Sequence, residues 1–377
     1  MPNTTLTGLQ HISGHQKLRF ENAVDFSIHQ IKQLVNQKPD LFPMYTINGR
    51  WKIEGETWTN WCEGFIGGQL WLAYLITKDN FFRDKAKHYC RLIEPRKTDS
   101  KVHDLGFLFW PTWKCWYDLE GDPLAWQVVL EAGTTLANRF QPRGGYLCSF
   151  LAENSLFIDI MMNIGIVFYT AQQKGDKDLW NIACSHVQTT RRTLVRGDGS
   201  TAHEGVFDPQ SGEFLHQSTQ QGWRSDSCWA RGLAWAIYGF GTAFTYSHDP
   251  HDLSTAEACA QYFIEHTPTH GIPPNDWEEP SPKYSYESSA AAIAAGGLWQ
   301  LSHLTGDPAH AWLYRSTTLQ ILDTLSGPEF LAADNPEWEG ILKHGIYHQP
   351  KGLGVDESVA WGDYFFLETL LKVIGVE

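Results

Sequence analysis

Several features are missing from this sequence, and each absence excludes a class of protein. The seven cysteines include no C-x-x-C pair and are odd in number, which argues against a zinc ribbon and against a disulfide framework. No apolar run approaches the roughly 20 residues that span a bilayer, and the N-terminus shows no basic region followed by an apolar stretch. We therefore expect reduced thiols and a cytoplasmic protein without a membrane partner.

Positive charge is also scarce. The chain has 29 Lys and Arg residues against 43 Asp and Glu residues, which gives a formal net charge of −14. A chain this acidic lacks the basic surface that binds polyanions, so no nucleic-acid partner is expected. An anionic substrate would have to be held by a few local cations.

The sequence signatures of cofactors are absent as well. Neither a P-loop nor a G-x-G-x-x-G after a strand occurs, so nothing supports a nucleotide cofactor. His344, His348 and Asp363 lie in one C-terminal segment but lack the tight spacing of metal ligands. The sequence therefore predicts neither a cofactor nor a metal.

Aromatic residues, in contrast, are abundant. There are 17 Trp, 14 Tyr and 20 Phe residues, or 14% of the chain. A thick core accounts for most of them, because aromatic side chains bury much apolar area. Trp is hard to bury without a partner for its N–H group, so its number also indicates a cleft lined for the flat faces of sugar rings.

Helical periodicity dominates the sequence, and strand-like alternation is scarce. Between residues 154 and 173, for example, apolar residues recur at steps of three and four. Twelve helices are predicted on this basis, over residues 21–37, 59–77, 80–94, 103–118, 122–139, 154–173, 176–195, 227–246, 252–267, 285–304, 307–325 and 358–373.

A turn that contains Asp recurs between these helices. Gly or a polar residue ends one helix, Asp can cap the next, and Pro, where present, suits the first helical turn. The five turns are Lys78–Asn80, Gly121–Pro123, Gly175–Lys177, His248–Pro250 and Gly306–Pro308. The longer connections lie near 38–58, 140–153, 196–226, 268–284 and 326–357.

This alternation of short turns and long connections predicts an all-α fold. Six helical hairpins, with the short turns at one end and the long loops at the other, describe a single-domain (α/α)6 toroid or barrel over residues 1–377. Residues 1–20 are expected to form a loosely ordered N-terminal segment. An open solenoid is the alternative, but the absence of polar capping repeats favours closure. Functional residues are expected in the long loops.

Two aspartates are candidate catalytic acids. Asp104 precedes an apolar run, where it is either a helix N-cap or a functional acid. Asp159 is predicted about one turn inside a helix, with Asn163 one turn further along the same face. A carboxylate in that place is not expected to act as a cap, and burial would raise its pKa toward the range that a general acid needs.

Candidate binding residues follow later in the chain. Arg231 stands near the start of a predicted helix, where the helix dipole disfavours a cation, so we expect it to meet a carboxylate of the protein or of a ligand. A structural ion pair is the other interpretation. His203 lies in a long loop and is either a donor to substrate or a surface residue.

Together these segments resemble the unsaturated glucuronyl hydrolases, glycoside hydrolase family 88, from about Trp58 to the C-terminus. The stretches that match follow one another in the family's order. They are W-x-x-G-F-x-x-G (Trp61–Gly68), H-D-L-G-F (His103–Phe107), I-D-x-x-x-N (Ile158–Asn163), L-V-R-G-D-G-S (Leu194–Ser200), F-D-P (Phe207–Pro209), W-x-R-G-x-A-W (Trp229–Trp235), the segment Ser285–Ala291 and W-G-D-Y (Trp361–Tyr364).

The resemblance implies a six-hairpin barrel that acts on oligosaccharides left by polysaccharide lyases, such as glycosaminoglycan fragments. Their non-reducing uronic acid carries a C4=C5 double bond, and the implied reaction is hydration of this vinyl ether. Asp159 would protonate C4 and then take a proton from the water that adds at C5, and Asp104 would hold ring hydroxyls and keep the Asp159 pKa high. The residues expected to bind the substrate are His203, Gln221, Arg231, Trp235, Trp229, Trp61, His103, Tyr364 and His344.

The sequence departs from the family pattern at two positions. Gln220 stands where the family has His before Gln-Gly, and Leu233 stands where Gln is frequent. The loop before Asp159 is also shorter. These changes leave the acid pair intact and bear on ring positioning and on the choice of aglycone.

Four other interpretations fit the same residues. An unsaturated rhamnogalacturonyl hydrolase shares the barrel and the chemistry, although the H-D-L-G-F segment favours the glucuronyl type. An inverting glycosidase would place Asp104 and Asp159 across an intact glycosidic bond. A sugar epimerase would need facing imidazoles, such as His203 and His344. A non-catalytic carbohydrate-binding protein would tolerate the loss of Asp159.

The uronide, its sulfation and the oligomeric state are left open by the sequence.

Overall fold

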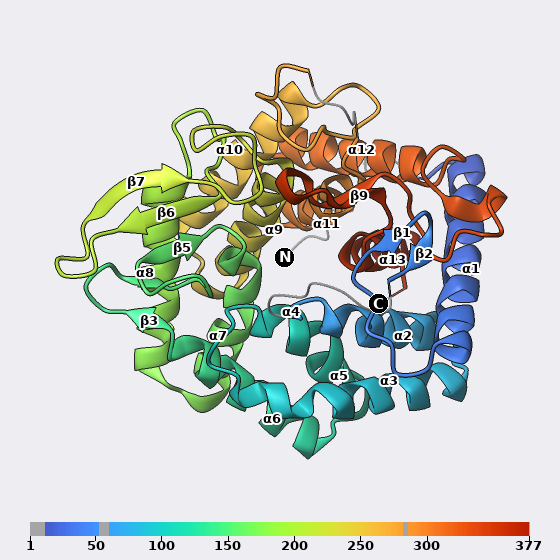
Figure 1. The fold of residues 1–377 in the computed structure, drawn as a ribbon, viewed down its shortest axis with the longest axis horizontal. Helices are drawn as coiled ribbons and strands as arrows, with labels where there is room; N and C mark the ends of the chain where they lie inside the picture. The colour runs from blue at the N-terminus through green and yellow to red at the C-terminus, as the bar shows by residue number, and fades with distance from the viewer. Residues whose placement is uncertain (1–11, 53–59, 282–285, 377) are drawn as a thin grey trace, which may run out of the picture.

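In the described part of the chain, six helices stand side by side in a closed ring around the axis of the molecule (Figure 1). The computed structural model describes residues 12–52, 60–281 and 286–376. In chain order the ring consists of α2 (Glu63–Thr77), α4 (Leu105–Phe109) with its continuation α5 (Cys115–Glu120), α7 (Ile160–Lys174), α9 (Ala230–Ser247), α11 (Ser288–Leu304) and α13 (Ala360–Ile374). Each helix contacts the next in this order, and α13 contacts α2. The predicted barrel is therefore confirmed, and the open solenoid is wrong.

A second layer of six helices covers the outside of this ring. These helices are α1 (Gly14–Gln37), α3 (Asn80–Ile93), α6 (Pro123–Ala137), α8 (Lys177–Leu194), α10 (Pro250–His266) and α12 (Pro308–Leu325). Five of them follow a ring helix directly and form a hairpin with it. The sixth pair is not a hairpin, because α1 packs on α13 and these helices come from opposite ends of the chain.

The recurring Asp turns fold as the sequence predicted. Each Asp caps the following outer helix by accepting a hydrogen bond from a backbone N–H group in its first turn, and the five caps are Asp79, Asp122, Asp176, Asp249 and Asp307. Four of the preceding ring helices end on a residue in the left-handed conformation, namely Lys78, Gly121, Gly175 and His248. These local signals fix the short-turn end of the barrel.

The long connections at the other end carry short strands. These are β1 (Thr46–Ile47), β2 (Arg50–Trp51), β3 (Phe140–Gln141), β4 (Tyr146–Leu147), β5 (Ser155–Phe157), β6 (Glu204–Phe207), β7 (Phe214–Ser218), β8 (Gly345–His348) and β9 (Leu353–Glu357). They pair antiparallel as β1–β2, β3–β4, β5–β6–β7 and β8–β9. Short 3-10 turns occupy residues 94–98, 332–334 and 349–351. This layer forms the mouth of the barrel.

The predicted start of helix 154–173 is wrong, because the helix begins only at Ile160. The residues before it form β5, in which Ser155 pairs with Val206 and Phe157 with Glu204 of β6. This pairing is non-local, and it overrides the helical spacing of the apolar residues. Asp159 therefore stands at the N-cap position of α7 and not inside the helix.

Other helix boundaries also differ from the prediction, and two of these differences have a clear local cause. Helix α1 begins at Gly14, where Ser13 and Gln16 form a capping box, so residues 14–20 are helical and not loosely ordered. The predicted helix 103–118 runs from Leu105 to Glu120 and contains a π-helical turn over residues 110–114 that includes Pro111, which cannot donate to a regular helical hydrogen bond. Residues 1–11, Thr59 and Ser285, which also belong to predicted segments, lie outside the described residues.

The helices and the cysteines bear on two of the exclusions drawn from the sequence, those of a membrane span and of a disulfide framework. Within the described ranges, no helix is both long enough and apolar enough to cross a membrane. All seven cysteines are free thiols, and five of them are buried.

The Asp caps give a prediction about stability. We expect Asp122→Ala to lower the free energy of unfolding by about 1 kcal/mol, because Asp122 accepts from the backbone N–H groups of Leu124 and Ala125. Urea denaturation would measure the loss. The control is Glu21→Ala, which removes only an exposed ion pair with Lys17 and should cost about 0.5 kcal/mol or less. Equal losses in both variants would contradict the role of the caps.

Candidate active site

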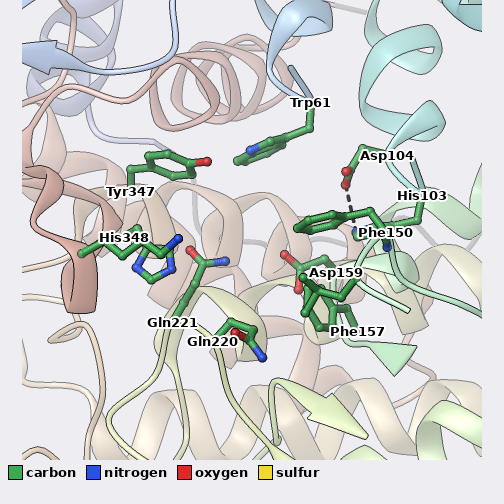
Figure 2. A pocket seen from close by; sticks show the side chains of 12 residues that line it. Trp61, His103, Asp104, Phe150, Phe157, Asp159, Gln220, Gln221, Tyr347 and His348 are labelled. Carbon is green, nitrogen blue, oxygen red and sulfur yellow. Dashed lines mark hydrogen bonds and ion pairs between the residues drawn. The ribbon is translucent and has the colours of Figure 1, made fainter. Parts of the chain in front are cut away.

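A pocket of about 710 Å³, counted with its opening to solvent, lies at the mouth of the barrel (Figure 2). Its walls come from segments that are far apart in the sequence, since the described residues that line it are Trp61, His103, Asp104, Phe150, Leu151, Phe157, Asp159, Gln220, Gln221, Tyr347, His348 and Lys351. Aromatic rings thus surround two carboxyl groups. A pocket of this size and composition suits a small, ring-shaped ligand.

Asp104 occupies the N-cap position of α4, but its side chain makes no capping hydrogen bond. The carboxyl group belongs to the pocket lining instead, with 6% of the side chain exposed. Burial raises the Asp104 pKa well above its ordinary value, and the charge of Asp159 adds to this rise, whereas Arg96 and Arg139 oppose it. The interpretation of Asp104 as a helix cap is therefore wrong.

Asp159 also stands at a helix N-cap position without capping the helix. Its side chain is 15% exposed and lines the pocket, and burial raises its pKa to about 6, against the opposing effects of Arg231 and Trp235. We expected Asp104 to hold the Asp159 pKa high. Burial is the largest cause of the rise, and the repulsion between the two carboxyl groups is mutual, so each acid disfavours ionisation of the other. A carboxyl group with this pKa can both donate and accept a proton near neutral pH.

The tautomer of His203 follows from its backbone contacts. Its Nδ1 atom accepts hydrogen bonds from the backbone N–H groups of Gln220 and Gln221, at 3.1 and 3.3 Å. The neutral ring must therefore carry its hydrogen on Nε2, which lies 3.6 Å from Oδ2 of Asp159. Burial lowers the pKa of His203 to about 3, so this ring is a neutral donor directed at the acid.

His103 repeats this arrangement at the other acid. Its Nδ1 atom accepts from the backbone N–H group of Phe150 at 3.0 Å, and its Nε2 atom lies 3.3 Å from Oδ1 of Asp104 (Figure 2). Burial lowers the His103 pKa well below its ordinary value. Each candidate acid is thus paired with a neutral imidazole whose tautomer is fixed by the backbone.

Arg231 is buried at the start of α9, and its hydrogen bonds do not go to a carboxylate. Its Nη1 atom donates to the carbonyl of Ile346, and its Nη2 atom donates to Oε1 of Gln221 at 2.6 Å and to the carbonyl of Tyr347 at 2.8 Å. The guanidinium lies 4.4 Å from the centre of the Trp229 ring. Among the described residues, the expected contact with a protein carboxylate is therefore wrong, whereas a contact with a ligand carboxylate stays a prediction. Arg231 holds one pocket wall in place.

Polar atoms without a protein partner gather around Asp159. Among the described residues, the buried side-chain atoms that lack a hydrogen bond include Oδ2 of Asp159, Nε2 of His203, Nε of Arg231 and the indole nitrogens of Trp229 and Trp235. Buried polar groups are normally satisfied, so a cluster of this kind indicates a place for water or for the polar groups of a ligand. No line of sequence reasoning pointed to this clustering.

The structure brings together some of the predicted binding residues and separates others. Trp61, Gln221 and His103 line the pocket. Tyr364 does not, because its hydroxyl donates to Glu368 beside a separate cavity deeper in the ring. His344 also lies outside the lining and contacts Asp356 at 2.6 Å. His203 and His344 therefore do not face each other across this pocket, as an epimerase would require.

Several lining residues were missed by sequence reasoning. Tyr347 and His348 come from β8, and Phe150, Leu151 and Phe157 come from the connection that contains β5. The long loops were expected to carry the site, but no spacing within them distinguished these residues. Among the described residues, no three or more His, Cys, Asp or Glu side chains lie together in a group that could hold a metal ion.

The fold and the pocket together define a class of protein. Two buried carboxyl groups in an aromatic pocket, at the mouth of an (α/α)6 barrel, describe a glycoside hydrolase. The chain belongs to Glycosyl Hydrolase Family 88, whose sequence profile matches residues 31–268.

Characterised relatives cover most of the chain. It is 31% identical to the unsaturated chondroitin disaccharide hydrolase of Streptococcus pneumoniae (strain ATCC BAA-255 / R6), over 93% of this chain and 90% of that protein. It is 32% identical to the unsaturated glucuronyl hydrolase of Bacillus sp. (strain GL1), over 84% of this chain and 86% of that protein.

Solved structures share the fold over nearly the whole length. The unsaturated glucuronyl hydrolase of Bacillus sp. GL1 superposes with a TM-score of 0.88 at 29% identity, covering 94% of this chain and 96% of that one. A mutant of the Streptococcus agalactiae enzyme complexed with dGlcA-GalNAc6S superposes with a TM-score of 0.81 at 26% identity, covering 98% and 94%. An unsaturated glucuronyl hydrolase specific for heparin gives 0.88 at 25% identity, covering 95% and 97%.

The two imidazoles give a prediction that needs no substrate. We expect His103 and His203 to stay neutral as Nε2–H tautomers from about pH 5 to about pH 8, because burial lowers both pKa values and backbone donors occupy both Nδ1 atoms. Nitrogen NMR of histidine-labelled protein would show this, with His103→Gln and His203→Gln to assign the signals. Protonation within that range, or a hydrogen on Nδ1, would contradict it.

Proposed function

We propose that this enzyme is an unsaturated glucuronyl hydrolase that releases the non-reducing Δ4,5-unsaturated uronic acid from lyase-generated oligosaccharides of the glycosaminoglycan type. The observation that carries the proposal is the buried acid pair, Asp104 and Asp159, in an aromatic pocket with unsatisfied polar atoms around Asp159. The named activities of the family relatives support it.

In the proposed reaction, Asp159 donates its proton to C4 of the C4=C5 bond. A water molecule then adds to C5 while Asp159 takes back a proton from it, so the acid is regenerated. The resulting hemiketal opens, the bond to the aglycone breaks, and the released sugar keeps the oxygen. A pKa of about 6 suits both steps, because the group spends time in each protonation state near neutral pH.

The remaining site residues have proposed roles that follow from their contacts. Asp104, with His103 beside it, contacts the ring hydroxyls, and His203 donates to the Asp159 carboxyl or to the substrate. Trp61 and Gln221 contact the unsaturated ring. The buried residues Arg231, Trp229 and Trp235 support these groups from behind. Tyr364 and His344 act outside the pocket, through their polar contacts with Glu368 and Asp356.

We also propose that the protein works in a reducing compartment such as the cytoplasm. The support is chemical, because all seven cysteines are unpaired and burial raises the thiol pKa of Cys90 and Cys228 to about 12. Such thiols react slowly and are typical of structural cysteines in reduced proteins.

The substrate test follows the double bond itself. We expect the wild-type protein to remove the ultraviolet absorbance of unsaturated disaccharides from lyase-digested chondroitin, hyaluronan or heparin, because hydration destroys the conjugated enol ether. Asp159→Asn should lose at least about 1,000-fold in kcat with folding retained, since Asn cannot donate the proton. The variant Asp363→Asn, which alters a buried carboxyl group outside the pocket lining, is the matched control.

Other outcomes would redirect the proposal. No absorbance change with any unsaturated uronide would overturn it and favour the inverting glycosidase, to be tested on saturated glucuronides. Activity only on unsaturated rhamnogalacturonan fragments would assign the enzyme to the related hydrolase type. Wild-type turnover in Asp159→Asn would remove this residue from the mechanism.

The pH dependence gives a second test of Asp159. Its raised pKa means that the acid is protonated below about pH 6 and ionised above it. We expect kcat/KM to fall as the pH rises through about 6, approaching a tenfold loss per pH unit, because only the protonated free enzyme can start the reaction. Rates measured from about pH 4.5 to about pH 8.5, with enzyme returned to pH 6 to check stability, would show this. A constant kcat/KM across that range would contradict the assignment.

A further inference from the structure

Glu287 lies just before α11 and is fully buried outside the pocket lining. Its carboxylate is the N-cap of α11 and accepts from the backbone N–H groups of Ser289 and Ala290. It also accepts from the Ser289 hydroxyl at 2.7 Å and from the backbone N–H group of Ile346 at 3.0 Å. Three of these donors belong to the start of its own helix, whereas the fourth belongs to β8.

The contact with β8 joins Glu287 to the pocket wall. Ile346 is held on both sides, because its N–H group donates to Glu287 and its carbonyl accepts from Arg231. Arg231 in turn fixes the next carbonyl, that of Tyr347, and the side chain of Gln221. Tyr347 and Gln221 both line the pocket. One buried carboxylate is therefore connected to two substrate-facing side chains.

A second branch starts at Ser289. Its hydroxyl donates to Glu287 and accepts from the indole N–H group of Trp361 at 2.9 Å. The Trp361 ring lies 4.6 Å from the ring of Trp61, which lines the pocket. Glu287 thus lies where two supports of the pocket wall meet.

The buried positive charge of Arg231 gives a second reason for the position of Glu287. The guanidinium of Arg231 is buried, and among the described residues its partners are carbonyl and amide oxygens. The carboxylates that act on it are Glu287, whose effect is the larger, and Asp159. A buried cation without an opposing charge is costly. Burial raises the Glu287 pKa, but Arg231 and the donors to its carboxyl group oppose that rise, so the two buried groups favour each other's charged form.

We propose that Glu287 is a positioning residue for the substrate, which holds β8 and Arg231 in place and through them orients Gln221 and Tyr347. Its effect on catalysis rests on the function proposed above. Its effect on β8 does not, since that part of the inference concerns only the folded protein.

The test uses two variants of the full-length protein. Glu287→Asp keeps the charge and a good helix N-cap, but its shorter side chain cannot also reach Ile346. Glu287→Gln removes the charge and sets an amide against backbone donors. We expect KM for the unsaturated disaccharide to rise about tenfold in Glu287→Asp with kcat reduced less than about threefold, and both values to worsen in Glu287→Gln.

Hydrogen exchange provides a readout that is independent of turnover. We expect amides 345–348 to exchange at least about tenfold faster in Glu287→Asp, while the thermal midpoint stays close to that of the wild type. The matched control is Asp252→Asn, a buried carboxyl group bonded to Ser247 and Arg191 at the short-turn end, which should lower stability without changing KM or β8 exchange.

The outcomes separate the two proposals. A folded Glu287→Asp variant with wild-type KM and wild-type β8 exchange overturns the positioning role. If Glu287→Gln does not fold, KM and β8 exchange in Glu287→Asp alone decide whether Glu287 has the positioning role. If wild-type protein consumes no unsaturated uronide, the proposed function fails, and β8 exchange still decides whether Glu287 holds the strand.

Discussion

The contact between α13 and α2 closes the ring of inner helices, and the rest of the molecule depends on it. Closure brings Trp361 from the last ring helix against Trp61, which precedes the first. It also joins the ends of the chain above the ring, where the backbone N–H group of Ala360 donates to the carbonyl of Met44. An open array of the same helices would have two free edges and no enclosed mouth, so the pocket is a consequence of closure.

The enclosed mouth removes charged groups from water, and this raises the free energy of their ionised forms. The pKa values of Asp104 and Asp159 are therefore raised. The charge of Arg231 is balanced by Glu287 and Asp159, although neither forms a direct ion pair with it. The two imidazoles beside the acids stay neutral and carry their hydrogen on Nε2. The site therefore contains few direct ion pairs, and a carboxyl group remains able to carry a proton at the pH where it is needed.

The two departures from the family pattern have different consequences in the structure. Leu233 is fully buried in α9 and does not line the pocket, so its effect is confined to packing. Gln220 lines the pocket, and its amide donates to the buried carboxylate of Glu204 while its backbone N–H group fixes the tautomer of His203. Differences in ring positioning within the family are therefore expected to originate at Gln220.

The sequence by itself predicted the twelve helices and the Asp-capped turns, and it marked Asp104 and Asp159 as candidate acids. These depend on local signals, namely helical spacing, capping residues and carboxylates next to apolar runs. Tertiary structure alone decided the start of α7, because β5 pairs with β6 about fifty residues away. It also decided the placement of Tyr347, His348 and Glu287, and the exclusion of Tyr364 and His344 from the pocket. Such contacts join segments that lie far apart in the sequence. No local spacing pattern marks them, so they can be identified only in the folded chain.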